Sequence, residues 1–181
     1  ESVLGNDTVL SAYTYDQAKA QVNGGELMLS VHPPAIRWLE WSLGYAKTSN
    51  SISGEDEKNL ALQPADKLVT SVRIQAETFS GMKNAFALFT WSSFTPQSSV
   101  ASFEKPFDAY SLLDVSFGGS MRWGEQYFDV TLAATNVLNS GYIQPLTTLY
   151  DQPIREIGRN IMIRFRFPIG FSAGKAPVVG S

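Results

Sequence analysis

The last apolar stretch of the chain alternates strictly between hydrophobic and other positions. Between residues 161 and 171 every odd position is Ile or Phe, while the even positions include Arg164 and Arg166. Because side chains alternate across a β-strand, this pattern predicts a strand with one apolar face and one face that carries two positive charges. A soluble strand turns such an apolar face towards a core, whereas a transmembrane barrel strand turns it towards lipid. The period alone does not choose between these environments.

Period-two segments recur along the chain, and no segment has the 3.6-residue period of an amphipathic helix. The sequence therefore predicts an all-β fold, an antiparallel up-and-down meander of about seven strands. The expected strands are 13–31, 39–45, 68–77, 85–94, 110–122, 127–135 and 161–171. Residues 1–12 have no clear period and are expected to form a loop. The apolar positions change from even to odd across Gly24-Gly25, which predicts a β-bulge there.

The connections between these strands alternate between short and long. The short ones are 32–37, 80–84 and 123–126, and the long ones are 46–66, 95–109 and 136–158. Outer-membrane barrels have this asymmetry, with short periplasmic turns and long outer loops. Aromatic residues near the expected strand ends would suit two interfacial girdles. For each residue alone an ordinary core contact is the better interpretation, but together with the loop asymmetry the pattern favours the membrane. They are Trp38, Phe79, Phe86, Trp123 and Tyr127 at the short turns, and Tyr45, Phe94 and Tyr110 at the long loops.

The composition of the chain argues against several classes of protein and of binding site. The chain has 181 residues, the length of one domain, with 17% charged and 12% aromatic residues, which is neither a disordered nor a helical-membrane composition. Its apolar runs fall far short of the ~20 residues that a membrane helix needs. The formal net charge of -3 gives no reason to expect a nucleic-acid partner, and the absence of cysteine excludes disulfides and cysteine-based metal sites.

Four short motifs follow one another along the chain. They are Gly24-Gly25-Glu26 running into His32-Pro33, Leu62-Gln63-Pro64, Thr135-Asn136-Val137-Leu138 with Tyr142, and Gly158-Arg159-Asn160 leading to Phe171. Together they resemble the C-terminal end of TonB-dependent outer-membrane receptors, over most of the chain. The last two motifs are the most specific, because their spacing to each other and to the end of the strand also fits.

The resemblance implies an energy-coupled receptor in the Gram-negative outer membrane. Such receptors import scarce ligands, usually ferric siderophores, haem, cobalamin or oligosaccharides, through a barrel of ~22 strands closed around a plug. The implied partners are the plug domain, the remaining barrel strands, outer-membrane lipid and the TonB energy complex, with no cofactor. About seven strands cannot close that barrel, and neither plug nor TonB box is present. We therefore expect a fragment, with residues 1–171 as barrel and 172–181 as a flexible tail that need not be native.

A second interpretation is a soluble or surface β-barrel of lipocalin type that binds a small apolar ligand. Its interior cavity would be lined by Val130, Leu132, Ile163 and Phe165. A passive structural barrel is a third interpretation. In the receptor interpretation, ligand recognition would come from the three long loops, because loops at one end of a rigid barrel are free to vary.

Five charged residues occupy the polar faces of the expected strands. They are Arg73, Asp114, Asp129, Arg164 and Arg166. In a barrel they would face the lumen, where a plug or ligand could contact them. Ion pairing within the wall, for example between Asp129 and either arginine of the last strand, is the interpretation that the sequence favours over direct ligand contact.

No catalytic constellation emerges from the sequence. His32 is the only histidine and precedes two prolines in an expected turn, so neither a Ser-His-Asp set nor a metal site can be assembled around it. The acidic run Glu55-Asp56-Glu57 lacks the alternating ligands and glycine of a calcium loop, and we expect it to lie in a solvated loop. The sequence therefore predicts no enzymatic activity.

Overall fold

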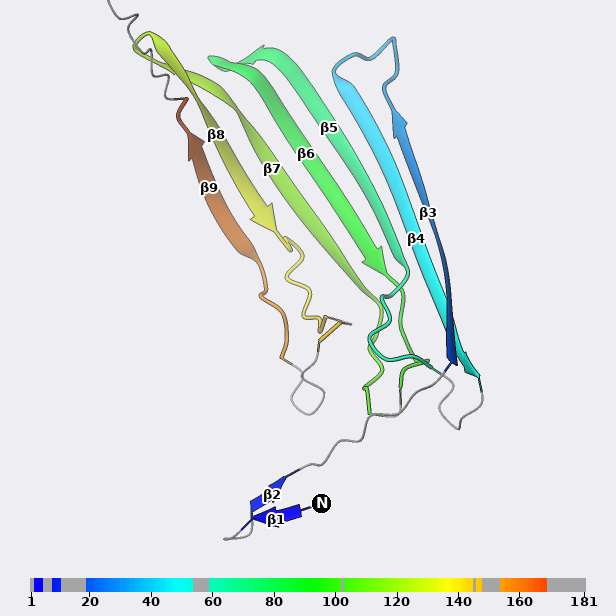
Figure 1. Ribbon diagram of the computed structural model, residues 1–181. Coiled ribbons are helices and arrows are strands. Elements are labelled where there is room, and N and C mark those ends of the chain that lie inside the picture. Colours follow the sequence, from blue (N-terminus) through cyan, green and yellow to red (C-terminus); the bar gives the residue numbers. More distant parts are fainter. Residues whose placement is uncertain are drawn as a thin grey trace, which may run out of the picture.

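Seven antiparallel strands form one open, curved sheet in the computed structural model (Figure 1). The structure describes residues 2–4, 8–10, 19–53, 59–101, 103–144, 146–147 and 154–168. The strands of the sheet are β3 (Lys19–Val31), β4 (Leu39–Ser53), β5 (Lys67–Phe79), β6 (Met82–Phe94), β7 (Tyr110–Trp123), β8 (Gln126–Thr135) and β9 (Asn160–Arg166). Each strand pairs with the next one in sequence, which confirms the predicted all-β meander. In this described part, no helix is long and apolar enough to cross a membrane.

The ends of the chain differ from expectation where they are described. Two short strands, β1 (Ser2–Leu4) and β2 (Thr8–Leu10), pair in a separate small sheet, so the expected loop over residues 1–12 is wrong at these positions. Three-residue strands are too short to show a readable period. The first strand of the large sheet begins at Lys19, and residues 13–18 of the expected strand lie outside the described part. At the other end β9 stops before Pro168, which cannot donate a ladder hydrogen bond, and residues 169–171 are again outside it.

The hairpin of β3 and β4 corrects two further predictions. β4 continues through its serine-rich end to Ser53, so the expected loop 46–66 is a strand over its first part. These polar residues lack the apolar alternation that predicts a strand, but their backbones pair with β3 throughout. No bulge occurs at the glycine pair, because pairing runs without a break from Lys19 opposite Ser53 to Val31 opposite Trp41. The hydrophobic residues on the two sides of the glycines therefore lie on opposite faces of one regular strand.

The pairing register gives the sheet an apolar face and a polar face. One row of cross-strand partners on the apolar face is hydrophobic on every strand: Val31, Trp41, Val72, Phe89, Val115, Ala134 and Ile161. A row on the polar face contains Ser30, Ser42, Ser71, Thr90 and Asp114. Large side chains of the apolar face stay exposed, with 58% exposure at Ile163 and 49% at Phe117. Only Ala85 and Ala101 are buried among the described hydrophobic residues, so this sheet has almost no core of its own.

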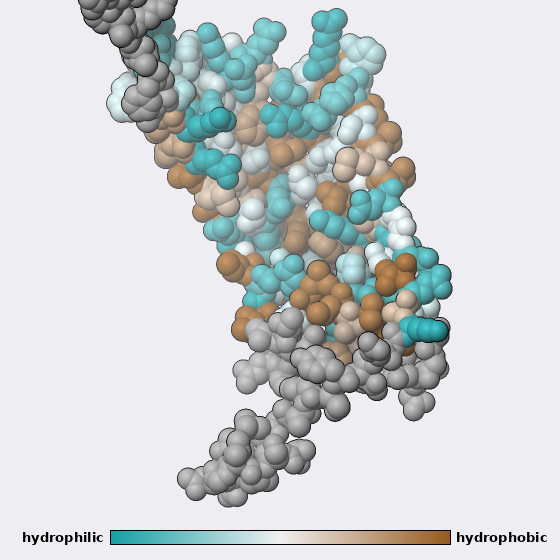
Figure 2. Space-filling model, viewed as in Figure 1, coloured by the Kyte–Doolittle hydropathy of each residue, from teal (hydrophilic) through white to brown (hydrophobic). Residues whose placement is uncertain are grey.

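The short connections all lie at one end of the sheet, as the sequence predicts, and the long ones at the other (Figure 1). Ser80 and Gly81 both have positive φ, as a type I′ hairpin turn requires, and the turn is shorter than the expected 80–84. Gly124 also has a positive φ, of 62°, and begins the β7–β8 turn. Hydrophilic side chains gather at this end of the molecule (Figure 2).

A register shift occurs on β6, between Lys83 and Phe86, where this strand pairs with β7. Two glycines of β7 lie beside this irregularity. A Cβ atom at Gly118 would lie 2.3 Å from the carbonyl oxygen of Val130, and one at Gly119 would lie 2.9 Å from that of Lys83. Backbones therefore approach here more closely than any side chain would allow.

We expect Gly118→Ala to lower the free energy of unfolding by about 1–3 kcal/mol, because the added methyl group forces the β7 and β8 backbones apart. Gly44→Ala is the matched control, since a Cβ at this strand glycine meets nothing within 4 Å. Urea unfolding in detergent, followed by circular dichroism, measures both. Equal stability of the two variants would contradict the close approach.

Candidate functional site

The structure places the five predicted charged residues on one face. Arg73 pairs with Leu88, Asp114 with Thr90, Asp129 with Arg166, and Arg164 with Thr131, all on the face opposite Ile163 and Phe165. They are spread from β5 to β9 and do not come together as a single site.

Most of these charges have local partners. The Asp129 carboxylate accepts a hydrogen bond of 2.7 Å from the Ser120 hydroxyl, and the Arg73 guanidinium lies 4.5 Å from the centre of the Phe86 ring. The expected ion pair of Asp129 with Arg164 or Arg166 is not formed in the described part of the chain, although Arg166 is the direct cross-strand partner of Asp129. β9 is an exposed edge strand, and an ion pair in water gains little there.

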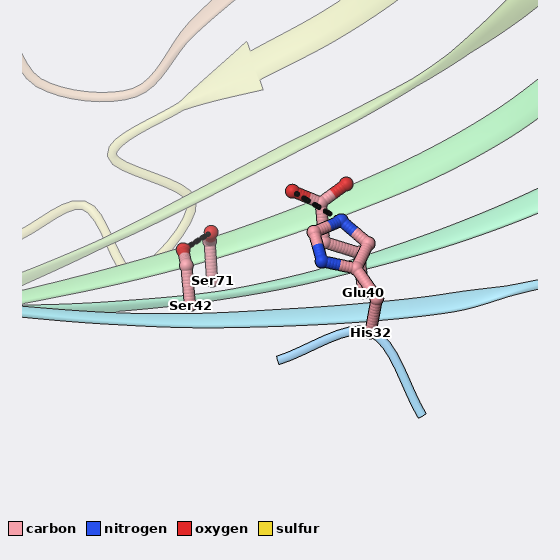
Figure 3. A network of polar contacts seen from close by, with 4 residues as sticks. All are labelled: His32, Glu40, Ser42 and Ser71. Carbon is pink, nitrogen blue, oxygen red and sulfur yellow. Dashed lines mark hydrogen bonds and ion pairs between the residues drawn. The ribbon is translucent and has the colours of Figure 1, made fainter. Parts of the chain in front are cut away.

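A polar network ties the first turn to β4 and β5 (Figure 3). His32 Nε2 lies 3.4 Å from Glu40 Oε1, and the Ser42 and Ser71 hydroxyls share a hydrogen bond of 2.6 Å. The side chains of Glu40, Ser42 and Ser71 project from their strands to the same side of the sheet. The two serines therefore bond to each other. The histidine side chain is 66% exposed, and its contact with Glu40 links the turn to β4. No group of three acidic or histidine side chains in the described residues could hold a metal ion, and Glu55-Asp56-Glu57 lies outside them.

At the long-loop end, Asn136 organises the connection that follows β8. Its backbone N–H donates to Asp114 Oδ1 at 2.8 Å, its Nδ2 donates to the Ser140 carbonyl, and its Oδ1 accepts from the Ser140 N–H. Ser140 in turn donates its hydroxyl to the Ser111 carbonyl. Asn136 is only 5% exposed and has a φ of 49°, a left-handed conformation that asparagine tolerates. Asp114, expected to lie on the lumen-facing side of a barrel, thus accepts a hydrogen bond that holds this turn.

The returning segment contacts this turn. Arg159 donates its Nε to the Val137 carbonyl at 2.8 Å, and its backbone N–H donates to Asn139 Oδ1 at 3.0 Å. A Cβ at Gly158 would lie 2.6 Å from the same Asn139 oxygen, so a side chain at this position would displace the Asn139 amide. We call residues 136–142 and 154–159 the loop clasp. The clasp joins the two most specific motifs of the sequence.

The clasp completes an aromatic column on the polar face. The Phe94 and Tyr110 ring centroids lie 4.5 Å apart and those of Tyr110 and Tyr142 lie 4.4 Å apart, both pairs nearly parallel. Lys67 places its ammonium 5.4 Å from the Phe94 ring. Burial raises the pKa of Tyr142 above its ordinary value of 10.0, and the Glu156 and Asp114 carboxylates raise it further. The column is a half-buried surface for stacking and hydrogen bonding, and it contains no activated nucleophile.

The sequence identified several residues of the clasp and the aromatic column but not the contacts between them. The sequence points separately to Asn136 and Arg159 as motif residues and to Tyr110 as a strand-end residue, but it does not predict the contacts that they make in the clasp and the aromatic column. An asparagine at the end of an alternating segment is a turn signal, and it is the one local feature that points to the clasp.

Comparison with known proteins gives no match for this chain, either among protein-family models, among curated proteins or among solved structures.

We expect Asn136→Ala to destabilise the clasp by about 1–3 kcal/mol, because Ser140 loses two partly buried hydrogen bonds. Asn136→Gly retains the positive φ and separates loss of the amide from backbone strain. Limited proteolysis of the 136–158 connection, together with urea unfolding, measures the effect. Asn160→Ala, at an exposed position of β9, is the control and should leave both readouts unchanged.

The titration of Tyr142 gives a second test. Since its pKa is raised in the folded state, this tyrosine contributes stability that is complete below pH 10 and is lost as the pH rises through the folded-state pKa. The difference in phenolate absorbance between wild type and Tyr142→Phe should therefore appear above pH 10. Glu156→Gln should lower the midpoint pH of this difference, because it removes a carboxylate that raises the pKa of Tyr142. A difference spectrum with its midpoint at or below pH 10 would contradict the buried, carboxylate-flanked position.

Proposed function

We propose that this chain is the C-terminal barrel section of a TonB-dependent outer-membrane receptor that imports a scarce ligand such as an iron–siderophore or haem. The observation that carries the proposal is the exposed apolar face, which is hydrophobic on all seven strands while the opposite face is polar. In a membrane barrel the apolar face meets lipid and the polar face lines the lumen. Such a sheet needs no second layer to cover it.

The height of the apolar face supports this proposal. On β5 it extends from Leu68 to Ala76, about 27 Å along the strand at ~3.4 Å per residue. A strand tilt of about 40° reduces this to roughly 20 Å, close to the ~25 Å apolar band of outer-membrane barrels. Polar residues follow on the same face towards the long-loop end, with Lys47 beyond Tyr45 and Ser93 beyond Trp91.

An aromatic cluster marks the other border of the apolar face. Trp123, Phe128 and Phe167 contact one another at the short-turn end, with ring centroids 5.1–6.4 Å apart. Trp123 is 73% exposed, which is unusual for so large a side chain in water. Aromatic rings at this height suit the interface between hydrocarbon and headgroups.

The two sheet edges that have no partner strand in the described part of the chain support membership of a larger barrel. β3 and β9 end the sheet, and they run in the same direction because each of the seven strands is antiparallel to its neighbour. A closed antiparallel barrel therefore needs an odd number of further strands, which gives the even total of bacterial outer-membrane barrels. In this proposal the remaining strands and a plug domain come from outside these 181 residues. Coupling to the TonB energy complex would require that other part.

The long-loop end would then face the cell exterior and take part in ligand recognition. The loop clasp and the aromatic column lie there, and the charged residues of the polar face would line the lumen towards the plug. The protein would be a transporter without catalysis of its own, located in the Gram-negative outer membrane.

The lipocalin-type alternative has no specific observation in its favour. Val130, Leu132, Ile163 and Phe165 share the apolar face, but none of them lines either of the two hollows described on this sheet.

We expect Ile163→Arg to lower the stability of the bilayer-inserted protein by about 2–4 kcal/mol, as arginine does on the lipid face near mid-membrane. Met162→Arg is the matched control, because the neighbouring side chain lies on the polar face, where the substitution should lower the stability much less. Urea unfolding from lipid vesicles measures both variants.

The proposal also requires that the chain be β-rich in detergent or lipid and not in plain buffer. Circular dichroism beside detergent–aqueous phase partitioning tests this requirement. A monodisperse, β-rich protein in plain buffer would overturn the membrane assignment.

A further inference from the structure

A hollow of about 440 Å³ lies on β3 and β4 where the apolar face gives way to polar residues. Three successive cross-strand pairs on this face line it: Leu27 with Tyr45, Gly25 with Lys47, and Asn23 with Ser49. The β3 residues Gly24 and Glu26 also border it, although their positions in the register belong to the polar face. The hollow exists because its middle row has no side chain on β3. A Cβ at Gly25 would meet no atom within 4 Å.

The polar side of the hollow offers positive charge. The Lys47 side chain is 61% exposed, and its ammonium lies 3.6 Å from Asp66 Oδ2. A charge-assisted hydrogen bond is closer to ~2.8 Å, and an ammonium has three donors, so this pair leaves most of the binding capacity of Lys47 unused. In the described part of the chain Lys47 has no other side-chain partner. An anionic group is the complement of this position.

The other side of the hollow is bordered by exposed hydrophobic side chains. Leu27 is 64% exposed and Leu29 is 46% exposed, and both continue the apolar face away from Lys47. Tyr45 lies between the two regions, with a ring that can contact chains and a hydroxyl that can contact headgroups. A molecule that fills the hollow must therefore be anionic at the long-loop end and apolar along the strand.

We propose that this hollow binds the headgroup of a phosphate-bearing anionic lipid, with Lys47 at the phosphate and an acyl chain along Leu27 and Leu29. The proposal rests on the proposed function, since lipid meets this face only if the chain spans a bilayer. The three pairs change from polar at the long-loop end to apolar along the strand. A bilayer lipid has the same order, with its headgroup at the interface and its acyl chains towards the membrane centre. It also gives the Gly24-Gly25 motif a role, because any side chain at position 25 would occupy the headgroup space.

Native mass spectrometry of the whole chain in detergent tests this, with added phosphatidylglycerol or zwitterionic phosphatidylcholine as the probe. Lys47→Gln should raise the apparent Kd for phosphatidylglycerol about fivefold, the effect of one basic residue at a membrane surface, and raise that for phosphatidylcholine less, because the choline ammonium offsets the phosphate charge. Lys67→Gln, at the neighbouring level but on the polar face, is the charge-matched control and should change neither Kd. Gly25→Val should weaken binding of both lipids.

Equal Kd values for phosphatidylglycerol in wild type and Lys47→Gln would overturn the lipid site. Lys47→Gln changes an exposed side chain, so this comparison stands even if Gly25→Val fails to fold. If the chain inserts into bilayers but the two Kd values agree, the lipid site fails and the receptor proposal stands. If the chain is β-rich and monodisperse in plain buffer, the receptor proposal itself fails, and the lipid site with it.

Discussion

The backbone ladder between neighbouring strands is the interaction on which this structure depends. A single open sheet satisfies its N–H and C=O groups strand to strand, but its hydrophobic side chains have no second layer to pack against. In water, leaving side chains such as Ile163 and Phe165 exposed forfeits the main favourable term of folding, about 25 cal/mol for each Å² of apolar surface. In hydrocarbon the same exposure costs nothing, while the ladder becomes obligatory because no water can replace it. The separation of apolar and polar faces is therefore the central physical fact of this chain.

The two ends of the sheet are built by different means. At the short-turn end, positive φ at Ser80, Gly81 and Gly124 reverses the chain within two residues. At the long-loop end, side chains hold the connections, with Asn136 bonded to Asp114 and Ser140, and Arg159 bonded to Val137. A connection fixed by its own side chains presents a defined surface. Loops on a rigid barrel are suited to recognition in this way.

The charges of the polar face divide into two groups. Arg73, Asp114 and Asp129 have partners on adjacent strands or in the clasp, so they stabilise the wall. Arg164 and Arg166 stand on the edge strand and make no ion pair or side-chain hydrogen bond within the described residues. Two arginines beside a free edge are suited to a partner on the far side of that edge, or in the lumen. The receptor proposal supplies both.

The sequence by itself predicted the seven strands of the large sheet, their order and the two faces, because alternation and tight turns are local properties of the chain, but it missed the short strands β1 and β2. It also located the motif residues around Asn136 and Arg159. It did not determine the polar extension of β4 to Ser53, the regular pairing through Gly24 and Gly25, or the register shift beside Lys83. Each of these features depends on the backbone hydrogen bonds and the register that the neighbouring strand provides. The clasp and the Phe94–Tyr110–Tyr142 column likewise join residues far apart in sequence, and only the tertiary structure brings them into contact.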